Sequence, residues 1–100
     1  MRGVVWSETA IAQYDDAIDY LAERNEPAAM QLADRIEDAV NALARRPAGR
    51  PGQAEGTFEK IVQKTPYLLV FELVGDELRV LRLFHMSQDW QNWNDEEEAP

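Results

Sequence analysis

The sequence holds a single histidine, His85, the one side chain whose ordinary pKa lies near neutral pH. Four basic residues that precede it could place positive charge beside a phosphate: Lys60, Lys64, Arg79 and Arg82. Chemistry at a phosphate needs both parts, because a proton must be transferred while negative charge builds up on the phosphate. These five residues are therefore the catalytic candidates if the protein is an enzyme.

The spacing of these residues argues against a shared site. If residues 77–84 form a regular strand, Arg82 lies on the same face as the apolar residues, whereas Arg79 and His85 lie on the opposite face. Each also has a structural alternative. We expect Arg79 to pair with a neighbouring glutamate such as Glu59, Glu72 or Glu77, Arg82 to be paired and partly buried, and His85 to make a structural hydrogen bond.

A second group of residues suits binding rather than chemistry. Arg45 and Arg46 end a predicted helix and Arg50 follows in a loop, so the three could meet an acidic partner, although helix-end and turn chemistry would explain them equally well. Of the last two tryptophans, we expect Trp93 to be the more exposed and Trp90 to close the edge of the core. The predicted binding residues are Arg45, Arg46, Arg50, Arg79 and Trp93.

Several kinds of chemistry are missing from the sequence. The absence of cysteine removes disulfides and thiolate zinc sites, and Asp15, Asp16 and Asp19 are typical of a solvated helix face rather than a metal site. We expect no metal and no cofactor. No stretch has the length of a signal peptide's apolar region or of a membrane span, so the expected location is the cytoplasm, without a membrane partner.

The net charge of −9 argues against tight nucleic-acid binding, which depends on neutralising phosphates. The charge is unevenly distributed. Residues 1–44 carry nine acidic and three basic residues, residues 45–82 carry five and seven, and residues 83–100 carry five and none. Only the middle of the chain is basic.

The elements that would position these residues follow from periodicity and capping signals. A short strand ends at Ser7, which begins a helix to about Arg24, and Asn25 begins a second helix that Pro47 stops. Residues 47–56 are predicted to be a loop, followed by strands at 58–63, 67–74 and 77–84, with Gly75-Asp76 as a two-residue turn. The apolar run 67–71 is typical of a central strand covered on both faces.

The predicted fold class is therefore α+β: an N-terminal strand, an antiparallel helix hairpin and a three-stranded antiparallel meander in one sheet. We expect one domain over residues 1–93. Residues 94–100, NDEEEAP, are expected to be a disordered acidic tail.

Several short motifs occur in order along the chain: Trp6-Ser7, GRPG at 49–52, Gly56-Thr57-x-Glu59, Pro66-Tyr67-Leu68-Leu69-Val70, Leu81-Arg82-Leu83 and His85-x-x-x-Asp89-Trp90. Together, over residues 4–91, they resemble the ParE/RelE superfamily of type II toxin-antitoxin toxins, above all its ParE branch. The resemblance implies a toxin that a cognate antitoxin neutralises in a hetero-oligomer, and whose ParE members inhibit DNA gyrase by binding.

The resemblance leaves two alternatives: a RelE-like, ribosome-dependent mRNA endonuclease that uses the five catalytic candidates, and a non-toxic scaffold that only binds antitoxin. Two departures from the family pattern remove positive charge. Phe58 stands where the family usually has arginine, and Gln88 stands where it often does. Both changes favour a binding inhibitor over an enzyme.

Overall fold

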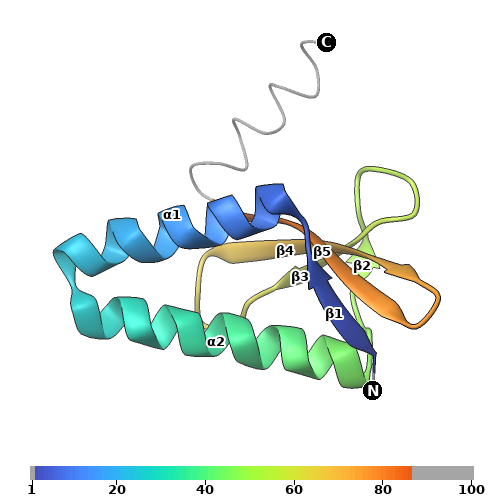
Figure 1. Cartoon of the computed structure of the whole chain (residues 1–100), viewed down its shortest axis with the longest axis horizontal. Coiled ribbons are helices and arrows are strands. Elements are labelled where there is room, and N and C mark those ends of the chain that lie inside the picture. The colour runs from blue at the N-terminus through green and yellow to red at the C-terminus, as the bar shows by residue number, and fades with distance from the viewer. Residues whose placement is uncertain (1, 87–100) are drawn as a thin grey trace, which may run out of the picture.

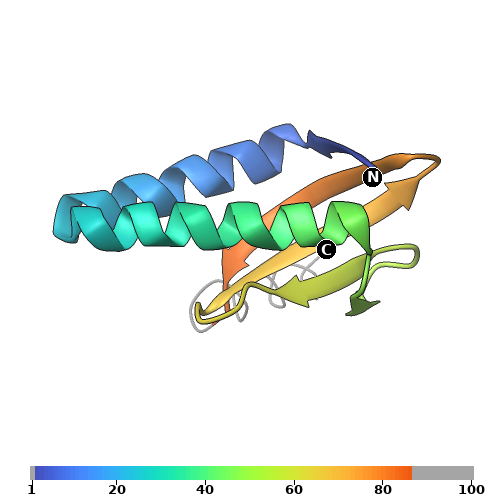
Figure 2. The same ribbon diagram turned by 90° about the horizontal axis from the view of Figure 1, so that it is seen from below.

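The computed structural model describes residues 2–86, which form a helix hairpin on one face of a sheet (Figures 1 and 2). The elements follow in the order β1 (Gly3–Trp6), α1 (Glu8–Arg24), α2 (Glu26–Arg45), β2 (Arg50–Pro51), β3 (Phe58–Ile61), β4 (Tyr67–Val74) and β5 (Glu77–His85). The predicted α+β class is confirmed. The tail 94–100 lies outside the described residues.

The five strands have the order β1-β5-β4-β3-β2, with β1 parallel to β5 and every other pair antiparallel. The apolar strand β4 lies in the middle, as its composition predicted, and a Gly75-Asp76 turn joins it to β5. The prediction that residues 47–56 are only a loop is wrong, because Arg50 and Pro51 pair with Glu59 and Phe58 as the short edge strand β2.

Both helices begin at the predicted caps. The Ser7 hydroxyl accepts a hydrogen bond from the Ala10 amide at 3.0 Å. Asn25 serves both helices, because its backbone N–H donates to the Leu21 carbonyl while its side chain accepts from the Ala28 amide. A single residue between two helices leaves room only for a tight reversal, so α1 and α2 lie antiparallel.

Apolar side chains bury both faces of the sheet. The larger cluster lies between the helices and the sheet and includes Ile36, Leu43, Leu69, Phe71 and Leu78. The smaller cluster, Leu68, Val70 and Phe84, lies on the opposite face, which we call the outer face. This double coverage explains why β4 is almost continuously apolar.

A β-bulge interrupts the pairing of β4 with β5. Val70 pairs with Arg82 and Phe71 pairs with Val80, so Leu81 has no partner on β4. The groups around the bulge bond to α1 and its cap instead: the Ser7 hydroxyl donates to the Leu81 carbonyl at 2.9 Å, and the Leu83 amide donates to Gln13 Oε1 at 2.7 Å. These two hydrogen bonds make the bulge part of the contact between the sheet and the helix hairpin.

The bulge overturns one expectation about faces. A regular β5 would put Arg79 and Arg82 on opposite faces, but the extra residue reverses the alternation after Val80. Leu78, Val80 and Leu83 face the helices, so Arg79 and Arg82 share the outer face, and His85 joins Leu83 on the helix side.

Ser7→Ala should destabilise the protein by about 2–3 kcal/mol, because it removes a helix cap and leaves the Leu81 carbonyl without its donor. Asn25→Ala, which removes only the exposed side-chain bond to the Ala28 amide, should cost about 1 kcal/mol. Urea denaturation of both variants measures the difference. Equal losses would show that Ser7 does not hold the bulge.

Candidate functional site

His85 lies on the helix side of the sheet, at the end of β5. Its ring meets the ring of Tyr67, the residue opposite on β4, edge to face with centroids 5.1 Å apart. It lines a cavity of about 280 Å³ with Lys64 of the β3–β4 turn and Arg35 of α2. The structure therefore brings two of the five catalytic candidates together.

Lys60 is close to this region but faces a separate hollow. It lies opposite Leu69 on the helix side and lines that hollow with Arg35 and Asp38. Arg35 was not among the sequence candidates, although its position beside the buried Leu32 and Ile36 on α2 could have indicated that it points toward the sheet. Lys64 has φ of 63°, a left-handed conformation at the turn.

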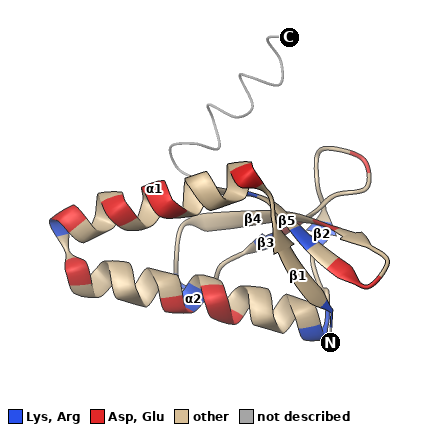
Figure 3. Cartoon of the chain, viewed as in Figure 1, with Lys and Arg blue, Asp and Glu red and all other residues tan. Residues whose placement is uncertain are grey.

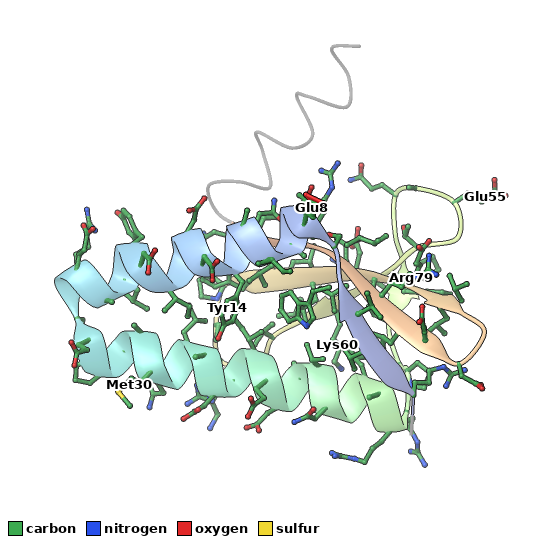
Figure 4. The ribbon with its side chains drawn as sticks, viewed as in Figure 1. Glu8, Tyr14, Met30, Glu55, Lys60 and Arg79 are labelled. Atoms are coloured by element: carbon green, nitrogen blue, oxygen red, sulfur yellow. The ribbon has the colours of Figure 1, made fainter. Side chains whose placement is uncertain are left out.

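The two remaining candidates occupy the outer face. The Arg79 Nε donates to Glu77 Oε1 at 3.1 Å, and its Nη1 lies 3.9 Å from Glu72 Oε2, so the predicted pairing with neighbouring glutamates is confirmed (Figure 4). Arg82 is half-buried opposite Val70. The sheet thus separates these arginines from His85, Lys60 and Lys64.

The outer face also holds a buried carboxylate, that of Glu59, in one cross-strand row with Arg82. Glu59 is only 5% exposed and accepts a hydrogen bond from Arg50 Nε at 3.1 Å. Arg50, Glu59, Val70 and Arg82 are successive partners across β2, β3, β4 and β5. Sequence reasoning treated Glu59 only as a possible partner of Arg79, and the pairing with Arg50 was not predicted.

The GRPG motif at 49–52 and the Gly-Thr-x-Glu motif at 56–59 belong to one local structure. A side chain on Gly49 would approach the Glu59 carbonyl to 2.8 Å and the Phe71 ring to 3.1 Å, so glycine is required there. The Gly52 amide donates to the Thr57 carbonyl at 2.8 Å. Phe58, at the position where the resemblance led us to expect arginine, stacks on Phe71 with centroids 5.7 Å apart. Residue 58 therefore contributes core contact.

The other predicted binding residues are dispersed. Arg45 and Arg46 are exposed at the end of α2, whereas Arg50 is held by Glu59. Trp90 and Trp93 lie outside the described residues. Within residues 2–86, no group of three or more His, Asp or Glu side chains could hold a metal ion, and no helix has the length and apolarity to cross a membrane.

A solved structure shares this architecture and gives the class of protein. The chromosomal ParDE toxin-antitoxin system from P. aeruginosa contains a chain 26% identical to this one, with a TM-score of 0.74 over 85% of this chain and 96% of that chain. The fold is that of the ParE/RelE superfamily of type II toxin-antitoxin toxins.

Residues 4–90 match the family described as ParE toxin of type II toxin-antitoxin system, parDE, and the chain belongs to that family. It is 33% identical over 90 residues to Y4kP of Sinorhizobium fredii, a candidate toxin, covering 89% of this chain and 93% of that protein. It is 27% identical over 88 residues to toxin RelE2 of Caulobacter vibrioides, covering 88% and 99%.

Arg50→Ala should destabilise the fold by about 1–3 kcal/mol, because it leaves the buried Glu59 carboxylate without its cation. In a Glu59→Gln background the same change should cost less than half as much, since a neutral amide does not need a cation. Glu77→Gln, at an exposed ion pair, is the control and should change stability by less than about 0.5 kcal/mol. Denaturant titration tests the set, and an Arg50→Ala effect that stays the same in the Glu59→Gln background would contradict the account.

Proposed function

We propose that this ParE-family toxin, when free, inhibits DNA gyrase by binding it, and that a cognate antitoxin neutralises it by covering its surface. The membership of the ParE family supports the choice of target. The proposal requires no covalent chemistry by the toxin itself.

One observation carries the preference for binding over catalysis. Phosphodiester cleavage needs the proton-transfer group and the cations to converge on one phosphate. Here Arg79 and Arg82 lie on the outer face, while His85, Lys60 and Lys64 lie on the helix side. Arg79 and Arg50 are also bound to glutamates, which offsets their charge.

A ribonuclease is the second candidate, and one feature favours it. His85, Lys64 and Arg35 line the same cavity, so a proton-transfer group and two cations are within one hollow. Against this, the Tyr67 ring lies against the imidazole of His85. A non-toxic scaffold that only binds antitoxin would keep the fold and lose both activities.

Induced expression of the free toxin in bacteria separates these functions. We expect DNA breaks within the first minutes while translation continues. His85→Gln and Lys64→Asn should keep this effect within about twofold, whereas removing a general acid or base from a ribonuclease would lower activity by about 10² or more. Asparagine at residue 64 removes the charge and tolerates the left-handed backbone.

Wild-type growth arrest that begins with loss of translation, and disappears in both variants, would establish the ribonuclease instead. If the wild-type protein is soluble and has no effect on growth, the non-toxic scaffold is the alternative that remains. Western blotting of each variant controls for expression.

A further inference from the structure

Arg35 of α2 lines two hollows on the helix side of the sheet. The first, of about 290 Å³, is also lined by Lys60 and Asp38. The second is the cavity of about 280 Å³ beside His85, and Lys64 also lines it. We call Arg35, Lys60 and Lys64 the cation cluster. It contains both lysines of the sequence, and its members come from α2, β3 and the β3–β4 turn.

Local structure fixes where each cation of the cluster lies. Arg35 is half-buried on α2, and the half-buried Lys60 faces the helices from β3. Lys64 has φ of 63° in a turn where the Thr65 amide donates to the Val62 carbonyl at 3.2 Å. A lysine rarely adopts this left-handed backbone, and residues held in it occur often at binding sites.

Within residues 2–86 the cluster is not neutralised by the protein. The ion pairs of this part of the chain involve Arg50 and Arg79, and the guanidinium of Arg24 lies 3.7 Å from the centre of the Tyr20 ring. No ion pair or hydrogen bond joins a side chain of the cation cluster to another described residue. Because unpaired like charges repel one another, an anion that binds among them is stabilised.

The charge around the cluster limits the size of that anion. Figure 3 shows acidic residues along both helices, and residues 8–45 carry nine acidic residues against three basic ones. Among the described residues, Asp38 is the one carboxylate that lines the first hollow, and none lines the second. A small anion therefore meets mainly the three cations, whereas a long polyanion would also meet the acidic helices and be repelled.

The shape of the site indicates linked phosphates. An arginine fork and lysine ammonium groups are the cations that proteins use to bind phosphate. Because the cluster spans two hollows that share Arg35, an anion that contacts all three cations must reach from one hollow into the other. A single phosphate is too compact to do so, but a chain of two or three phosphates has the required extent and charge.

We propose that the cation cluster binds a small molecule with two or more linked phosphate groups. A nucleotide and an inorganic phosphate chain both provide this chemistry. Tyr20 and Tyr67 also line the second hollow, where they would contact the base of a nucleotide. The site goes beyond the proposed function and does not depend on it.

Calorimetric titration of the full chain at low salt, with a chelator present, tests the proposal. The probes are inorganic triphosphate, ATP and inorganic phosphate. We expect triphosphate or ATP to bind at least about tenfold more tightly than phosphate. Tighter binding of ATP than of triphosphate would identify a nucleotide as the ligand, and the reverse or equality would identify an inorganic chain. Both results support the proposal.

Matched charge variants show where the probe binds. Arg35→Gln with Lys60→Gln should weaken triphosphate by at least about tenfold. Arg45→Gln with Arg46→Gln removes the same charge from the exposed end of α2 and should change binding by less than about twofold. Lys64→Asn, which tolerates the left-handed backbone, should weaken binding by about threefold or more. Circular dichroism checks that each variant is folded.

Equal weakening by the two double variants, or phosphate binding as tightly as triphosphate, would overturn the proposal. Tighter binding of a single-stranded RNA hexamer than of triphosphate would also overturn it, in favour of a nucleic-acid ligand. Gyrase, growth arrest and antitoxin are absent from these measurements. Failure here would therefore leave the proposed function untouched, and failure of gyrase inhibition would leave the titration result standing.

Discussion

The contact between Ser7 and the β5 bulge fixes the relation of the hairpin to the sheet. β1 runs parallel to β5 as far as Trp6 opposite Val80, and the Ser7 hydroxyl then both caps α1 and donates to the carbonyl of the unpaired Leu81. Gln13, six residues further along, accepts from the Leu83 amide. Backbone groups at and just after the bulge thereby bond to α1 and its cap, so the start of α1 and the change of face in β5 depend on each other.

That change of face decides which side chains can act together. Because alternation reverses after Val80, Arg82 joins Arg79 on the outer face and His85 is placed beside Tyr67 and the helices. The cations of the outer face lie among carboxylates, and the acidic hairpin covers the other side of the sheet (Figure 3). A molecule with this charge distribution, an acidic hairpin side and an outer face where cations are paired with carboxylates, is suited to recognising partners.

Local signals predicted most of the fold, and tertiary interactions account for what they missed. Ser7 and Asn25 mark the helix starts, and the apolar run at Tyr67 marks the central strand, because caps and burial patterns act within a few residues. The bulge could not be read from alternation alone, since Leu81 is as apolar as Val80 and Leu83 close to it, and Ser7, which bonds to its carbonyl, is 74 residues away. For the same reason the sequence separated Arg79 from Arg82. It missed Arg35 because α2 and the β3–β4 turn must meet to form the cavity that Arg35 lines. It missed the Arg50–Glu59 pair because the short strand β2 was predicted to be a loop.

The most direct test of binding without catalysis is stoichiometry with purified components. The free toxin is titrated into DNA gyrase acting on relaxed plasmid, and in parallel into ribosomes translating a defined mRNA. A binding inhibitor should stop supercoiling only as its concentration approaches that of gyrase, and should leave the mRNA intact. Cleavage of the ribosome-bound mRNA by amounts of toxin far below the ribosome concentration, with supercoiling unaffected, would contradict the account.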